Sequence, residues 1–70
     1  MSSLSDQKIQ IGQKISSARE KKHMSQAQVA DLVKIHTNYY ARIERGDANP
    51  TLDVLLAIAD VLEMNILTTR

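Results

Sequence analysis

Apolar residues recur at the spacing of an α-helix along nearly the whole chain, and no stretch alternates between apolar and polar residues as a strand would. Ile11, Ile15 and Ala18 stand at positions i, i+4 and i+7, which predicts the inner stripe of a first helix over about residues 5–22. Gly12 lies within this helix, and we expect it to weaken the middle of the helix slightly.

Two short helices are predicted to follow, separated by a tight connection. Ser25 and Gln28 have the spacing of a capping box, so they open a second helix over about residues 26–33. A third helix over about residues 37–45 comes next. Gly46 suits the left-handed residue that commonly ends a helix.

Thr51 is a good N-cap for a fourth helix over about residues 52–62, and Asp53 places a negative charge in its first turn, where the helix dipole favours it. This helix is apolar on nearly all sides, so we expect it to form the buried centre of the fold. The pattern predicts one all-α domain over residues 1–70, a compact bundle of four or five helices.

Composition narrows the class of protein. Seventy residues allow one small domain, and the absence of cysteine excludes disulfides and thiolate metal sites, which fits a reducing compartment. His23 and His36 have no supporting carboxylate pattern, so no metal or other cofactor is expected. No apolar run approaches the ~20 residues that cross a bilayer, and the start lacks a signal-peptide layout. We expect a cytoplasmic protein with no membrane partner and no small-molecule ligand.

The charges are distributed unevenly although the formal net charge is only +1. Residues 1–46 contain eight lysines and arginines against four acidic residues, whereas residues 47–70 contain one arginine against four acidic residues. Such an asymmetry suggests one cationic and one anionic face. An ordinary solvated surface explains the same charges equally well, so the asymmetry alone does not select a partner.

The second and third helices form a tight helix-turn-helix unit. Two short helices joined so closely cross at a steep angle, and Ala30 supplies the small residue needed where their backbones approach. Tyr40 and Ile43 lie three residues apart and are expected to face inward. The small or polar residues of the third helix then point outward: Thr37, Asn38, Ala41 and Arg42.

An enzyme is not expected. The chain has no glycine-rich phosphate loop, no cysteine and no histidine beside a nucleophile, and 70 residues leave little room for a catalytic pocket.

Four segments occur in register with a known family: IGQKISSAREKK, SQAQVA, YYARIERG and NPTLDVLLAIADVL. Over about residues 9–67 the chain resembles the helix-turn-helix domain of phage repressors and Cro proteins, the xenobiotic-response-element type of bacterial regulator. The resemblance implies a lambda-repressor-like fold and sequence-specific binding to double-stranded DNA.

The resemblance also implies roles for particular residues. Arg19 and Glu44 match a partly buried structural ion pair. Gln26 matches a residue that contacts a phosphate and braces the reading helix. It stands at the start of the second helix, where free N–H groups, together with Ser25, suit an anion. Arg45 matches another phosphate contact. Base contacts fall on residues of the third helix, the element that enters the major groove: Thr37, Asn38 and Arg42.

Three positions depart from the family pattern. Lys34 stands where the turn usually has glycine, and a position near the phosphates would offset the cost of its left-handed conformation. Tyr40 replaces an inward Ile or Val, so its hydroxyl needs a partner or an exit to water. Glu63 replaces the glycine that commonly follows the fourth helix. Tyr39 has two possible roles: it contacts a phosphate or sugar, or it packs on the first helix.

The expected function is a sequence-specific transcriptional regulator, either a small repressor or a controller protein. One reading helix contacts only a few base pairs, so we expect a homodimer on a palindromic operator. Ile66 and Leu67, with the outer side of the fourth helix, offer apolar surface for the dimer contact. The alternative is a protein-interaction module, such as an antitoxin or an adaptor that binds a partner protein.

Overall fold

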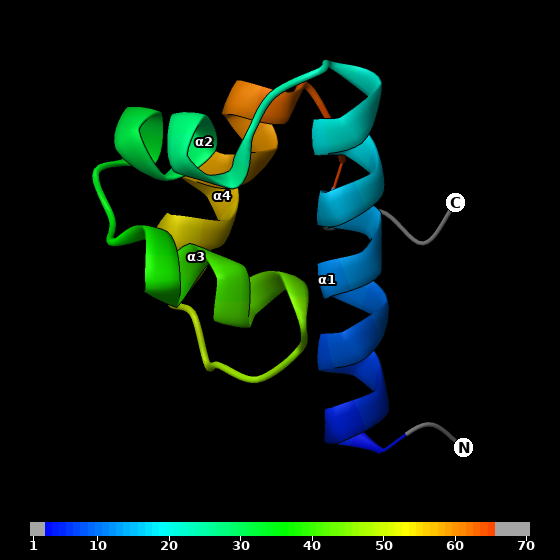
Figure 1. The fold of residues 1–70 in the computed structure, drawn as a ribbon. Helices are drawn as coiled ribbons and strands as arrows, with labels where there is room; N and C mark the ends of the chain where they lie inside the picture. Colours follow the sequence, from blue (N-terminus) through cyan, green and yellow to red (C-terminus); the bar gives the residue numbers. More distant parts are fainter. Residues whose placement is uncertain (1–2, 66–70) are drawn as a thin grey trace.

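The computed structural model describes residues 3–65 and folds them into four helices with no strand among these residues. They are α1 (Leu4–Lys21), α2 (Gln26–Val33), α3 (Thr37–Glu44) and α4 (Leu52–Leu62). Each helix bound lies within one residue of its predicted position. Figure 1 shows α1 running along one side of the domain, with the three shorter helices packed on its other side. None of these four helices has the length and apolarity needed to span a membrane.

The helix starts follow the local sequence. The Ser25 hydroxyl accepts a hydrogen bond from the Gln28 N–H group at 3.0 Å, and the Gln28 side chain accepts one from the Ser25 N–H group at 2.7 Å. The Thr51 hydroxyl accepts from Val54 at the start of α4. A second capping box, between Ser3 and Asp6, begins α1 one residue earlier than predicted. These bonds satisfy N–H groups that a helix start leaves without partners.

All four helices end in the same way although only one of them is followed by glycine. A residue with positive φ comes after each helix, and its N–H group and the next one bond carbonyl groups three and five residues back, as in a Schellman motif. The four residues are His23 (φ 57), Lys34 (φ 65), Gly46 (φ 75) and Glu63 (φ 54). The left-handed conformation costs a non-glycine residue about 1 kcal/mol. Packing of the whole fold therefore compensates for this cost at three positions, His23, Lys34 and Glu63.

The core lies where the four helices meet. Its largest fully buried side chains come one from each helix: Ile15 of α1, Val29 of α2, Tyr40 of α3 and Ile58 of α4. Ala30 is also buried, at the approach of α2 to its neighbours. Tyr40 and Ile43 both face inward, as their spacing predicts.

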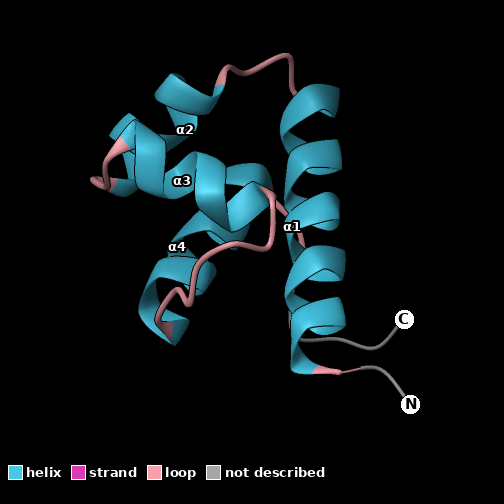
Figure 2. Cartoon of the chain, turned by 60° about the horizontal axis from the view of Figure 1, so that its bottom comes forward, coloured by secondary structure: helices cyan, strands magenta, loops and turns pink. Residues whose placement is uncertain are grey.

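Gly12 has a tertiary role that its place in α1 does not suggest. It is buried, and a Cβ atom there would lie 2.6 Å from the backbone oxygen of Ile43 and 2.8 Å from the carbonyl carbon of Glu44. Backbone atoms cannot move aside as a flexible side chain can. Glycine therefore lets the end of α3 meet the middle of α1, the approach visible in Figure 2. Its cost to helix propensity is secondary to this contact.

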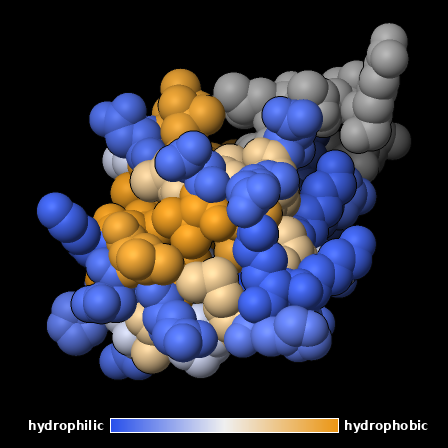
Figure 3. Space-filling view, turned by 90° about the horizontal axis from the view of Figure 1, so that it is seen from above, coloured by the Kyte–Doolittle hydropathy of each residue, from blue (hydrophilic) through white to orange (hydrophobic). Residues whose placement is uncertain are grey.

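The expectation that α4 is buried on nearly all sides is wrong for one face. Leu52 and Leu56 are 56% and 43% exposed, and Leu32 of α2 is 59% exposed. Seen from above in Figure 3, hydrophobic side chains gather on the surface beside a hydrophilic region. Four helices of this length enclose too little volume to cover α4 completely, so one stripe of it stays at the surface.

Candidate nucleic-acid interface

The outer face of α3 is open to solvent. Thr37 and Asn38 are exposed in its first turn, and Arg42 is exposed one turn farther along. Asn38 and Arg42 stand at i and i+4 and therefore share one side of the helix. Tyr40 and Ile43 hold the opposite side in the core. The helix is thus anchored by two apolar contacts while its polar side remains free.

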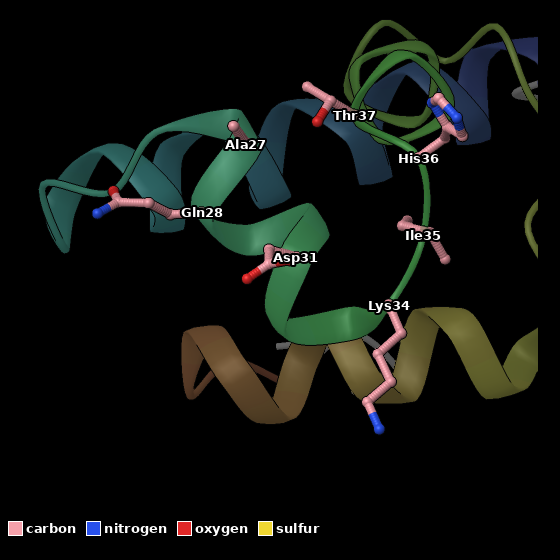
Figure 4. Close-up of a pocket in the computed structure, with 7 residues that line it drawn as sticks. All are labelled: Ala27, Gln28, Asp31, Lys34, Ile35, His36 and Thr37. Atoms are coloured by element: carbon pink, nitrogen blue, oxygen red, sulfur yellow. The ribbon is translucent and has the colours of Figure 1, made fainter.

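Thr37 also borders a shallow hollow between α2 and the start of α3. Figure 4 shows its hydroxyl directed over this hollow, whereas the Lys34 side chain extends away from Thr37. Lys34 therefore sits at the edge of this surface and does not join Thr37 in one cluster. The lining residues are Ala27, Gln28, Asp31, Lys34, Ile35, His36 and Thr37.

Beneath this surface, Arg19 and Glu44 form a buried ion pair that joins three helices. The Arg19 Nε atom donates to Glu44 Oε2 at 2.7 Å, and Nη2 donates to Oε1 at 3.2 Å. Nη1 donates to the Met24 carbonyl at 2.8 Å. The Gln26 amide donates to Glu44 Oε1 at 2.9 Å. Four hydrogen bonds thereby connect the end of α1, the start of α2 and the end of α3.

The surroundings of Glu44 keep its carboxyl group ionised. Burial by itself would raise the pKa of Glu44, but the Arg19 guanidinium, the neighbouring Tyr40 hydroxyl and the Gln26 amide together hold that pKa below its ordinary value. The hydrogen bond from Arg19 to Glu44 raises the pKa of Arg19 in turn, against the opposing effect of burial. Both partners are therefore charged at neutral pH.

The Tyr40 hydroxyl has neither of the two outcomes expected for it. It is fully buried and does not reach the edge of the domain, and no described atom meets it in hydrogen-bond geometry. Burial, followed by the nearby Glu44 carboxylate, raises the pKa of Tyr40 well above its ordinary value. The phenol therefore stays protonated and supplies packing volume to the core.

Gln26 contacts the end of α3, which agrees with the bracing role that the resemblance implied, and the structure identifies Glu44 as its partner. Its half-buried side chain uses one amide hydrogen on Glu44, which leaves the second hydrogen as the donor for any external anion. A long-range bond between residues 26 and 44 leaves no signal in local spacing. The resemblance implied a brace from Gln26 to the third helix, but it did not identify Glu44 as the partner.

The remaining candidate residues are placed as follows. Arg45 is exposed just beyond α3, and Ser25 is exposed at the start of α2. Tyr39 is half-buried and packs against the core. Ile66 and Leu67 lie outside the described residues.

Arg42 carries a contact that the sequence did not predict. Its Nη2 atom donates to the backbone oxygen of Asp47 at 2.9 Å, and its Nε atom lies 3.9 Å from the Asp47 carboxylate. Asp47 follows α3, and no periodicity relates a loop residue to the preceding helix. The pair places an acidic group beside a cation of the candidate surface.

Comparison with known proteins agrees with this geometry. A sequence model of the helix-turn-helix family matches residues 15–67. The chain is similar to the immunity repressor protein of Bacillus phage phi105, with 34% identity over 56 residues, which cover 80% of this chain and 39% of that protein. It is also similar to the cryptic phage CTXphi transcriptional repressor RstR of Vibrio cholerae serotype O1, with 34% identity over 58 residues, which cover 83% of this chain and 52% of that protein. The chain spans about half or less of the length of these two relatives.

Proposed function

The chain belongs to the helix-turn-helix family, in its phage-repressor and Cro type, and from this premise we propose that it is a transcriptional repressor that binds specific sequences of double-stranded DNA. The observation that carries the proposal is the division of α3 into two sides. Tyr40 and Ile43 hold one side in the core, while Asn38 and Arg42 stand exposed on the other. A helix held in this way presents side chains to a major groove without losing its own packing.

Thr37, Asn38 and Arg42 are proposed to read base edges. Asparagine can bond adenine with two hydrogen bonds and arginine can bond guanine in the same way, and each such pair gives about 1–3 kcal/mol of discrimination. Residues around this surface are proposed to hold phosphates. They are Ser25, Gln26, Lys34, Tyr39 and Arg45.

The Gln26 contact gives this arrangement a physical link to the core. Because its amide already bonds Glu44, the side chain has few rotamers left to lose when its second hydrogen meets a phosphate. A phosphate bound at the start of α2 would thereby be held in register with α3, whose last residue is Glu44.

We propose a homodimer on a palindromic operator, because two half-sites about one turn apart supply specificity that one α3 lacks. The exposed Leu52 and Leu56 side chains of α4 provide the apolar surface for the two-fold contact. Ile66 and Leu67, which follow the described residues, are proposed to extend it. The protein acts by binding and catalyses no reaction, and its place of action is the cytoplasm, where the DNA of a bacterial host lies.

A second candidate function rests on the same exposed apolar residues. Leu32 of α2 lies 59% exposed, in addition to the exposed leucines of α4. Exposed apolar surface of this kind suits a partner protein, as in an antitoxin or an adaptor. DNA binding remains the better supported function because the family and its phage relatives point to it.

Selection of duplexes from a random pool tests the proposal directly. The expected result is one enriched sequence with two-fold symmetry and a half-site spacing of about one helical turn. A salt titration on that duplex should lower the association constant by about one log unit per log unit of salt for each phosphate neutralised. If no duplex is enriched, and if any binding to random DNA does not respond to salt, the protein-partner function is favoured.

A further inference from the structure

The contact between Arg42 and Asp47 is built into the end of α3. The N–H group of Asp47 donates to the carbonyl group of Arg42 at 2.8 Å, and the Arg42 Nη2 atom donates back to the carbonyl group of Asp47 at 2.9 Å. The first bond belongs to the turn around Gly46 that ends the helix. The backbone of Asp47 is therefore fixed beside Arg42 by the fold, independently of either side chain.

The two contacts of the Arg42 guanidinium use the same edge of the group. Nη2 meets the Asp47 backbone oxygen, and Nε lies 3.9 Å from the Asp47 carboxylate. The described contacts leave the Nη1 atom and the second hydrogen of Nη2. These two donors form the end of the fork, and a forked pair of donors is what guanine O6 and N7 accept.

Asp47 is also the only acidic residue among those that line the hollow beside Arg42. Lys8 of α1 lines the same hollow and adds a second cation. Arginine is long and rotamer-rich, so an exposed guanidinium without a partner samples many orientations. The Asp47 carboxylate supplies the opposite charge that favours the observed one.

We propose that Asp47 is a positioning residue for base recognition: it holds the Nε edge of Arg42 so that the opposite donors are presented to a guanine. The inference rests on the proposed function, because it assumes that α3 reads DNA. Asp47 itself touches no base. Its effect is confined to the base pair that Arg42 reads.

The test uses the duplex selected by the wild-type chain and a set of duplexes in which each base pair is replaced in turn. Arg42→Ala first identifies the base pair read by Arg42, as the position at which discrimination is lost. Asp47→Asn, which removes the charge but keeps the backbone bond to Arg42 Nη2, should then lower discrimination at that base pair by roughly two- to fivefold, the range that an exposed ion pair supports. Discrimination at every other base pair should stay at the wild-type value.

Three controls separate orientation from charge and from folding. Asp60→Asn removes the same charge from an exposed position of α4 and should leave discrimination at the Arg42 base pair unchanged. In the Arg42→Ala background, Asp47→Asn should have no further effect on discrimination. Equal urea midpoints for wild type and Asp47→Asn are expected because Asp47 is exposed.

Two results would overturn the inference while leaving the proposed function in place. In one, Asp47→Asn strengthens binding to all duplexes equally and leaves discrimination intact, so that Asp47 acts only as a repelling charge. In the other, discrimination at the Arg42 base pair rises, so that Asp47 holds the guanidinium away from the DNA. A wild-type chain that enriches no duplex would refute the proposed function and this inference together.

Discussion

Arg19 and Glu44 meet at 2.7 Å, and Lys22 and Glu63 meet at 2.6 Å, yet the surroundings of these two ion pairs differ. The Arg19 and Glu44 side chains are 14% and 6% exposed, whereas those of Lys22 and Glu63 are 33% and 76% exposed. Both pairs connect residues that are far apart in sequence. The buried pair has a second hydrogen bond between its own side chains and two more to Met24 and Gln26, whereas the exposed pair has only its one hydrogen bond.

The comparison shows that distance alone does not indicate how much an ion pair contributes to stability. A hydrogen bond from Lys22 lowers the pKa of Glu63 with little opposition from burial. For Glu44, burial opposes ionisation and the surrounding donors outweigh it. Removing one partner therefore leaves an unpaired charge inside the protein in one case and a hydrated surface charge in the other.

The largest expected effect is that of Arg19→Ala. It leaves the Glu44 carboxylate buried without its main partner, which should lower the free energy of unfolding by about 3–5 kcal/mol. Urea denaturation followed by circular dichroism measures this change. Lys14→Ala, which removes the same charge from an exposed position of α1, serves as the control. An unchanged urea midpoint would show that the buried pair is no more important than the exposed one.

Gly12→Ala tests whether the buried pair depends on the close approach of α1 to α3. The added Cβ meets the backbone oxygen of Ile43, so the helices must separate, and we expect a loss of about 1–3 kcal/mol in the free energy of unfolding. Gln13→Ala, at the next and exposed position of α1, controls for helix propensity. Stabilisation by Gly12→Ala would mean that propensity outweighs the contact.

Lowering the pH should weaken the buried pair through Glu44. The pKa of this carboxyl group is lower in the folded state than in the unfolded chain, where it is about 4.3. Its stabilising contribution is therefore fully present above pH ~4.3 and is lost as the pH falls through the folded-state value. Urea midpoints between pH 7 and pH 3 should fall less steeply for Glu44→Gln than for wild type. Parallel curves would exclude Glu44 as the group responsible.

Tyr40→Phe tests the buried hydroxyl that lies beside the Arg19–Glu44 pair. The Tyr40 hydroxyl is buried without a partner in hydrogen-bond geometry, although it lies near enough to the Glu44 carboxylate to lower the pKa of that group. Relief of the unpaired hydroxyl should outweigh the loss of this interaction, so its removal should raise the free energy of unfolding by about 0.5–1 kcal/mol. Tyr39→Phe, at the half-buried neighbouring position, should change it less. Destabilisation by Tyr40→Phe would show instead that the hydroxyl donates a hydrogen bond to Glu44 in solution.

The smallest expected effect is that of Lys22→Ala at the exposed pair. Water and salt screen the interaction of Lys22 with Glu63, so the urea midpoint should stay at the wild-type value within error. Any loss should be largest at low salt, where screening is weakest, and should disappear at high salt. A loss comparable with that of Arg19→Ala would remove the distinction between the two pairs.

The helices could be predicted from the sequence because their signals are local. Capping at Ser25 and Thr51 and the inward spacing of Tyr40 and Ile43 each depend on residues within one turn. The family resemblance, carried by motifs at fixed spacing, also pointed to the Arg19–Glu44 pair. Periodicity likewise placed Asn38 and Arg42 on one exposed side of α3.

Only the tertiary structure decided the features that join distant segments. Gly12 matters because the backbone of residue 43 lies against it, and Gln26 because its amide reaches Glu44. Arg42 contacts Asp47, which the turn after α3 brings back beside the helix. Helical spacing records which side of a helix a residue occupies, but the distance to a residue on another segment arises only when the segments pack. For that reason the sequence alone determined the elements and their sides, and packing determined which polar groups meet.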